Sequence, residues 1–293
     1  MATSAKYLIN LFPTVAPRLP AATVEWDHRF MEQYSNVLRL YFNQIDAVFK
    51  AILTSDTGGA FLSFPYGAFH QDGVTTLSAN ISNVSTTPVS VASTDGFPSS
   101  GWFLIGGEII SYSGKTSTTF TGITRGVLGT TNLAHTAGAA IAEVQGTGSS
   151  TTIGQVLFNN TDYSNGVYTT SADYSKIYFT IEGLYNIQIS VQLLNFTTTD
   201  DNVTLWFRKN GTDIPASASI EQVNAKHGGD PGASILALNF YIDIAPTDYI
   251  QVVWTSNTGN TVVATYPAGV TPTHPVSPAI ILTASFVSKL PTT

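Results

Sequence analysis

The stretch YNIQISVQL, residues 185–193, alternates strictly between apolar and polar side chains. Successive side chains of a strand point to opposite faces, so this stretch has one core face and one polar face. The same period of two returns at residues 203–207, 236–244, 250–254, 262–266 and 280–286. Strands in series without intervening helices predict an antiparallel sandwich or barrel. Asn210-Gly211 predicts a tight hairpin between two of them.

The composition excludes several classes of function. Charged residues make up 11% of the chain, against about 25% in an average soluble protein. The net charge of −7 and the lack of any Lys/Arg cluster argue against nucleic acid as a partner. There is no Cys, which excludes a thiolate enzyme, a Cys-ligated zinc site and disulfides. No apolar run approaches the roughly 18 residues of a membrane span, and no signal-peptide core is found. We expect synthesis in a cytoplasm and no membrane insertion.

Residues 1–23 are predicted to form an extended anchoring arm. The segment contains Pro13, Pro17 and Pro20, and proline disfavours helix at the residues before it. The arm also has an apolar patch, made of Tyr7, Leu8, Ile9, Leu11 and Phe12. A lone apolar arm beside a stalk usually buries itself against another protein. We therefore expect the arm to bind another protein.

Residues 24–56 are predicted to form a helical stalk that begins after Thr23. Apolar side chains recur with heptad spacing, at Met31, Leu38, Ile45 and Ile52 and three residues later at Tyr34, Tyr41 and Val48. Phe42 and Phe49 widen the stripe. So broad a stripe favours three or more associated helices over two. The other interpretation is a helix packed on the globular part of its own chain.

The remaining chain is divided into three parts. Residues 57–83 hold the first strand or strands of the head, and residues 147–293 hold the remainder. Residues 84–146 are rich in Gly, Ser and Thr and are predicted to be a small inserted β module. Its expected strands are 102–105, 108–112, 119–123 and 139–144.

Several segments, in this order, resemble a known family: Phe64-Pro-Tyr-Gly-Ala-Phe69, Gly183-Leu-Tyr-Asn-Ile-Gln188, residues 206–215, Asp248-Tyr-Ile250 and residues 278–283. They are similar to the jelly roll of the complement-globular-head and tumour-necrosis-factor type found in tailed-phage structural proteins. The resemblance covers residues 61–80 and 151–290. It implies a tight trimer with one sheet facing the threefold axis, and we assign Gln188, Gln192, Tyr249 and Gln251 to that face. Residues 103–129 are similar to a small β module of phage tail and baseplate proteins.

No group of residues in the sequence has the spacing of a catalytic, metal-binding or cofactor-binding site. None of the histidines (His28, His70, His135, His227 and His274) forms a close pair or stands beside a carboxylate at ligand spacing. Asp200-Asp201 is interpreted as a solvated hairpin tip rather than as a calcium site. Tyr163, Tyr168, Tyr174 and Tyr178 cluster in one segment. Exposed aromatics of this kind can stack on sugars or partner proteins. We favour the interpretation that they line the trimer interface or cover the edge of the sandwich.

The sequence patterns and this resemblance together imply a non-enzymatic, homotrimeric protein on the surface of a tailed-phage virion. We expect it to be synthesised in the host bacterial cytoplasm and to bind other virion proteins through its N-terminal arm. The predicted stalk is compatible with a fibre or whisker at the neck or tail. The predicted compact trimer is equally compatible with a head decoration or cement protein. The alternative is a host-recognising, carbohydrate-binding adhesin on the same scaffold. Its partner is then a glycan or protein of the host surface.

Overall fold

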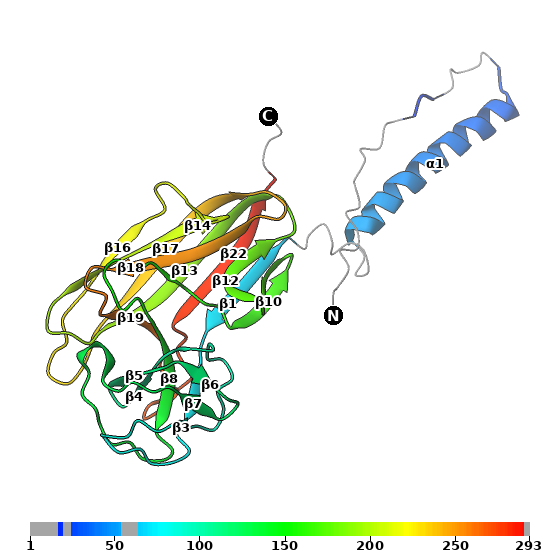
Figure 1. Cartoon of the computed structure of the whole chain (residues 1–293). Coiled ribbons are helices and arrows are strands. Elements are labelled where there is room, and N and C mark those ends of the chain that lie inside the picture. The colour runs from blue at the N-terminus through cyan, green and yellow to red at the C-terminus, as the bar shows by residue number, and fades with distance from the viewer. Residues whose placement is uncertain (1–16, 20–24, 54–63, 290–293) are drawn as a thin grey trace. The chain divides into compact units, whose positions relative to one another are not determined.

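The computed structural model describes residues 17–19, 25–53 and 64–289, without the side chains of residues 50–53 (Figure 1). The chain divides into two compact units, Met1–Phe64 and Pro65–Thr293. Within the described residues the first unit contains one α-helix and the second contains the strands. The protein is therefore mainly β, as the alternating pattern predicted.

Helix α1 spans His28–Leu53, inside the predicted stalk. It begins after Asp27, whose carboxylate accepts a hydrogen bond of 2.9 Å from the backbone N–H of Arg29. This bond satisfies one of the free N–H groups of the first turn. The helix thus starts later than predicted, and Thr23 lies outside the described residues. No helix in the described chain is long and apolar enough to cross a membrane.

Two antiparallel sheets form the body of the second unit. The larger sheet orders β10 (Asn160–Asn165), β1 (Tyr66–Gln71), β22 (Ile280–Ser288), β13 (Gly183–Asn195) and β17 (Gly232–Ile244). The smaller sheet orders β11 (Val167–Thr170), β12 (Asp173–Phe179), β18 (Tyr249–Ser256) and β14 (Asp201–Lys209). Strands β15 (Thr212–Asp213) and β16 (Ser219–Val223) also pair with β14, and β9 (Gly154–Gln155) pairs with β18. Strands β12, β13 and β14 alternate between the sheets, as do β17, β18 and β22, which is consistent with the predicted jelly roll.

The core lies between these two sheets. Tyr185, Ile187 and Val191 of β13 are fully buried and face the side chains of the smaller sheet. The smaller sheet contributes side chains that are equally buried, namely Val203, Leu205, Phe207, Ile250, Val252 and Trp254. The predicted hairpin is also present, because Asn210 and Gly211 both have positive φ, 51° and 81°. This conformation matches the type I′ turn that joins twisted strands.

A small lobe adjoins one end of the body (Figure 1). Its strands are β2 (Val74–Thr76), β3 (Val89–Ser90), β4 (Gly101–Ile105), β5 (Glu108–Tyr112), β6 (Gly114–Lys115), β7 (Thr119–Thr121) and β8 (Ala140–Gly146), with a 3₁₀ turn at Val127–Gly129. The lobe has its own apolar core, which includes Leu77 and Ile81. These two residues precede the predicted boundary at residue 84.

The lobe shares a sheet with the body rather than standing apart. Strand β8 pairs with β19 (Thr261–Ala264), and β19 pairs with the end of β13. The larger sheet therefore continues through β8 into β4 and β5. Residues 84–146 do not form a separate compact unit in the described structure. A last hairpin joins β20 (Gly269–Val270) to β21 (Thr273–His274).

Candidate functional site

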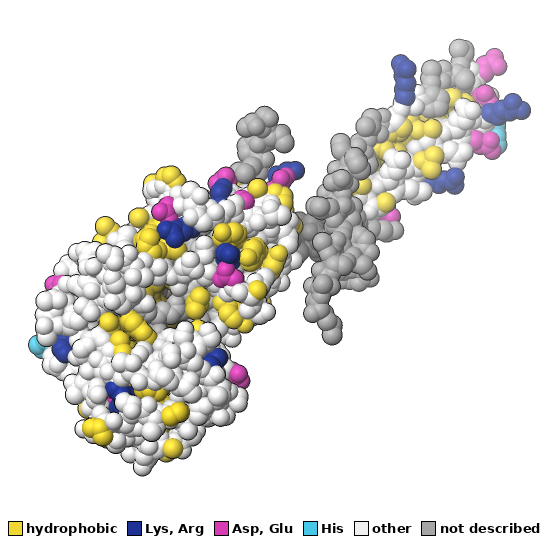
Figure 2. Space-filling model, viewed as in Figure 1, with side chains coloured by type: hydrophobic (Ala, Val, Ile, Leu, Met, Phe, Trp, Pro, Cys, Tyr) yellow, Lys and Arg dark blue, Asp and Glu magenta, His cyan; other side chains and the backbone are white. Residues whose placement is uncertain are grey.

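Helix α1 carries an apolar stripe at the predicted heptad positions. Tyr34, Leu38, Tyr41, Ile45 and Val48 are half-buried, and Met31 is 37% exposed. The flanking Phe42 and Phe49 are 61% and 56% exposed. Figure 2 shows hydrophobic side chains along the helix. No helix side chain is buried within the described residues. The side chain of Ile52 lies outside the described residues, as do the predicted arm residues Tyr7, Leu8, Ile9, Leu11 and Phe12.

The outer face of the larger sheet is almost free of charge. Along β13 and β22 its side chains alternate with the buried ones and include no charged residue: Leu184, Asn186, Gln188, Ser190, Gln192, Ile281, Thr283, Ser285 and Val287. Large apolar and aromatic side chains are exposed around this centre. They are Tyr66 (44%), Tyr163 (68%), Ile235 (64%), Tyr241 (56%), Ile281 (43%) and Val287 (48%). A face of this composition suits contact with protein better than contact with water alone.

The predicted head trimer residues do not form one surface. Gln188 and Gln192 lie on the outer face of β13 in the larger sheet, where Gln188 is exposed. Gln192 Nε2 donates to the carbonyl oxygen of Pro278 at 2.6 Å. Tyr249 and Gln251 lie on β18 of the smaller sheet. Gln251 is buried and donates to Ser175 Oγ at 3.0 Å, so its amide is already used inside the subunit.

The structure corrects the interpretation of the histidines. His70 lies between two carboxylates, with Nδ1 3.0 Å from Asp162 Oδ2 and Nε2 3.4 Å from Asp72 Oδ2. His135 contacts Glu108, and His28 lies one helical turn from Glu32. Two of these contacts, His70–Asp162 and His135–Glu108, bring together residues that are far apart in sequence. Even so, no group in the described residues has three side chains placed to hold a metal ion.

Glu108, Arg125 and His135 form a buried cluster that sequence reasoning missed. Glu108 is fully buried and accepts hydrogen bonds from Arg125 Nε at 2.6 Å and Nη2 at 2.7 Å. His135 Nε2 lies 2.8 Å from Glu108 Oε2. Burial raises the pKa of Glu108, but the hydrogen bonds and charge of Arg125 outweigh it, so the pKa is lowered. The sequence signal for this cluster was Glu108 itself, a single acidic residue in the apolar run 103–110. These partners use the hydrogen-bonding capacity of the Glu108 carboxylate, so we interpret the cluster as structural.

Asp201 is also not the solvated residue that was predicted. It is buried, and its carboxylate accepts hydrogen bonds from Thr261 Oγ1 at 2.6 Å and from the backbone N–H of Thr258 at 3.1 Å. Its neighbour Asp200 is exposed and accepts a hydrogen bond from the N–H of Ala225 at 2.8 Å. The buried Asp201 carboxylate thus holds the loop between β18 and β19 in place through these hydrogen bonds.

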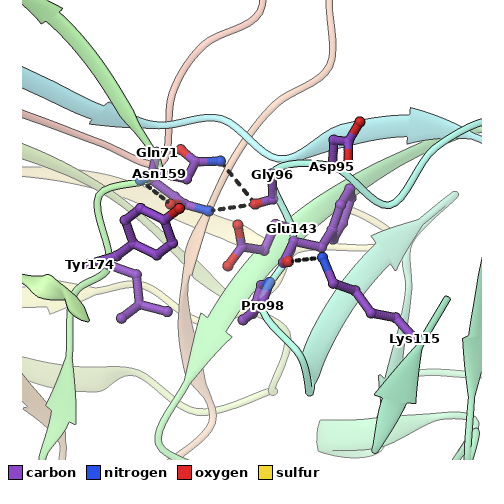
Figure 3. A pocket seen from close by; sticks show the side chains of 10 residues that line it. Gln71, Asp95, Gly96, Pro98, Lys115, Glu143, Asn159 and Tyr174 are labelled. Carbon is purple, nitrogen blue, oxygen red and sulfur yellow. Dashed lines mark hydrogen bonds between the residues drawn. The ribbon is translucent and has the colours of Figure 1, made fainter. Parts of the chain in front are cut away.

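A cavity of about 290 Å³ lies where the small lobe meets the body (Figure 3). Its polar lining comprises two carboxyl groups, two amides and one amine, from Asp95, Glu143, Gln71, Asn159 and Lys115. Phe97, Pro98, Leu157 and Tyr174 supply apolar surface. Segments of both the lobe and the body contribute, so only the folded chain assembles this site.

Glu143 of β8 is a buried acid in the lining of this cavity. It exposes 1% of its surface, and its carboxyl oxygens have no hydrogen-bond partner among the described residues. Gly73 packs closely against it, since a Cβ at position 73 would lie 2.9 Å from Glu143 Oε2. Burial raises the pKa of Glu143 to about 8, against the lowering effect of the Lys115 charge, and Asp72 raises it further. The side chain is therefore mostly a neutral acid at neutral pH.

The other polar groups of the cavity are held by the chain itself. Lys115 Nζ donates to the carbonyl oxygen of Thr94 at 2.9 Å and to that of Phe97. Asn159 Nδ2 donates to the carbonyl oxygen of Gly96 at 2.9 Å, and the N–H of Asn159 donates to Gln71 Oε1 at 3.1 Å. Glu143 thus differs from its neighbours in having no partner of its own.

Comparison with known proteins gives little beyond the fold. No protein-family model matches the sequence, and no curated protein matches it. Among solved structures, murine APRIL at pH 8.0 is similar over 50% of this chain and 92% of its own, with 11% identity and a TM-score of 0.32. Murine APRIL at pH 5.0 is similar over 46% and 88%, with 11% identity and a TM-score of 0.31. At such scores the likeness carries no argument about function.

Proposed function

We propose that this chain is a non-enzymatic structural protein that acts as a homotrimer on the surface of a tailed-phage particle. The stalk and the head both take part in trimer formation, and the arm binds another virion protein. The observation that supports the trimer proposal is the exposed apolar stripe of α1. Its half-buried positions repeat with heptad spacing, while Phe42 and Phe49 stay largely exposed.

The free energy available from the stripe supports association. Fully burying one large apolar side chain contributes roughly 1.5–3 kcal/mol. Met31, Phe42 and Phe49 each have more than a third of their surface exposed, so each gains from a partner helix. In an isolated helix these side chains have no apolar surface of a partner to pack on. The uncharged outer face of the larger sheet supports a second contact in the head.

Light scattering on the full-length chain tests this proposal. We expect a mass of about three times 31.2 kDa. A monodisperse monomer at micromolar concentration would contradict the trimer. Electron microscopy of particles labelled with an antibody to this protein then tests the location. Label at the neck or tail favours a fibre or whisker, and label over the shell favours a decoration protein. Particles without label would refute the virion role.

A further inference from the structure

We propose that residues 7–12 of the N-terminal arm dock in an apolar groove between neighbouring stalk helices, along Leu40, Phe42 and Phe49 of α1. This inference rests on the trimer proposed above, because two helices are needed to form the groove. It gives the arm a binding site within the free trimer, before any contact with another virion protein.

The apolar arc of α1 is wider than a contact between helices requires. At about 100° per residue, the large apolar side chains span an arc of about 200°, with Leu40 at one edge and Phe42 at the other. The half-buried heptad positions lie near the middle of this arc. The stripe that a helix packs into a core is about 100° wide, and a coiled-coil seam is narrower still. Both edges of the arc therefore lie outside the seam.

The two edges are exposed and free of charge. Leu40 exposes 60% of its surface, Phe42 61% and Phe49 56%. In a parallel trimer the two edges meet across each groove between neighbouring helices. The groove is therefore apolar along these three side chains. The described charged side chains after residue 28 lie on the opposite part of the helix surface: Arg29, Glu32, Arg39 and Asp46.

The arm has the chemistry that this groove requires. Residues 7–12 read YLINLF, with five apolar side chains and no charge, and they lie outside the described residues. Docking them in the groove buries apolar surface on both sides and removes no charge from water. Pro13, Pro17 and Pro20 favour an extended chain, which is narrow enough for a groove between helices.

The length of the arm places this segment beside the groove. The arm precedes α1, so it must turn back to run along the helix. If residues 20–27 form the turn, residue 12 lies about 25 Å and residue 7 about 40 Å along the stalk, at about 3.1 Å per extended residue. Phe42 and Phe49 lie about 21 Å and about 32 Å from His28, at about 1.5 Å per helical residue. The apolar segment and the apolar groove therefore overlap.

An arm held in the groove is not available to another protein. Binding of the arm to a virion component, as proposed above, then begins with its release from the stalk. The same apolar side chains serve both contacts, so a free trimer keeps them away from water until it meets its partner on the particle.

Cysteine cross-linking in the full-length protein tests the docking, because the chain has no cysteine of its own. The test protein carries Leu11→Cys and Phe42→Cys. The matched control carries Leu11→Cys and Asn43→Cys, since Asn43 is exposed and adjoins Phe42 but lies on the charged side of the helix. Under mild oxidation we expect free thiols to be lost several times faster in the test protein than in the control. Peptide mass spectrometry then identifies which residues are joined.

Circular dichroism and light scattering check that each variant is folded and trimeric. If Phe42→Cys disturbs the stalk, Phe49→Cys takes its place beside Leu11→Cys. Equal rates in the test and control trimers would overturn the docking and leave the trimer intact. Disulfides that join only two copies of position 42 would also overturn it, because the helices would then close on each other. A monomeric natural chain would instead refute the trimer on which the groove depends.

Discussion

The buried Glu143 should make the stability of the head depend on pH in an unusual direction. Its pKa is about 8 in the folded chain, against an ordinary value of 4.5 once unfolded. Between these values the folded state keeps a proton that the unfolded state releases, so the free energy of unfolding falls as pH rises. The stabilising contribution is complete below about pH 4.5 and is lost as pH rises through about 8.

The size of the effect follows from the same two values. One pKa unit corresponds to about 1.36 kcal/mol, so the rise from 4.5 to about 8 corresponds to about 5 kcal/mol in total. Glu143 exposes only 1% of its surface, so solvent does little to screen it. Glu143→Gln cannot ionise and should lack this loss altogether. Between about pH 4.5 and pH 8 the free energy of unfolding of the variant should therefore fall less with rising pH than that of the natural chain.

Urea unfolding followed by tryptophan fluorescence at about pH 5 and pH 8 measures the difference. The other titratable groups are common to both proteins, so their contributions cancel in the comparison. Glu182→Gln is the control, because Glu182 is 51% exposed and its removal should leave the pH slope unchanged. Parallel losses of stability in the natural chain and in Glu143→Gln would refute the reasoning.

Three further predictions concern the stalk, the lobe and the arm. Ile45→Asp would place three carboxylates near one axis of the trimer, so the stalk should splay while the head stays folded. An unchanged mass and circular dichroism spectrum would show that the heptad assignment is wrong. Arg125→Ala leaves the charge of Glu108 buried without its main partner and should cost about 3–5 kcal/mol in urea unfolding. Arg208→Ala removes the partner of Asp213, whose side chain is 59% exposed, and should cost about 1 kcal/mol or less. A chain lacking residues 2–23 should still form trimers but be absent from assembled particles, and normal incorporation would show that the arm is not the anchor.

Local pattern was enough to predict most of the longer strands, although β10, β12 and β16 were not predicted. The alternation in residues 185–193 reappears as the buried and exposed faces of β13, because a sandwich buries one face of each strand. Asn210-Gly211 predicted its turn because few residues adopt positive φ at both positions. The heptad spacing likewise predicted α1 and the side of it that is least exposed. Each of these features depends on neighbours within a few residues.

The candidate site could not be predicted in this way. In the stretch Ile141-Ala-Glu-Val-Gln145, Glu143 shares a strand face with the apolar Ile141 and the polar Gln145, so alternation does not predict whether Glu143 is buried. In the folded chain Gly73 covers its carboxyl group, and side chains at positions 71 and 159 join it around one cavity. Nothing in the spacing along the chain reveals that approach. The same holds for Arg125 and Glu108, which are 17 residues apart and meet only across the lobe.

The sequence by itself therefore determined the elements: a helix with an apolar stripe, a series of alternating strands, and the turns between them. Their period is set by the backbone, since side chains repeat every 3.6 residues in a helix and every two in a strand. Only the tertiary structure decided which polar side chains are buried. Burial depends on what the opposite sheet and the adjoining loops place over a residue, and for Glu143 those segments come from positions about 70 residues before it in the chain and about 15 and 30 after it.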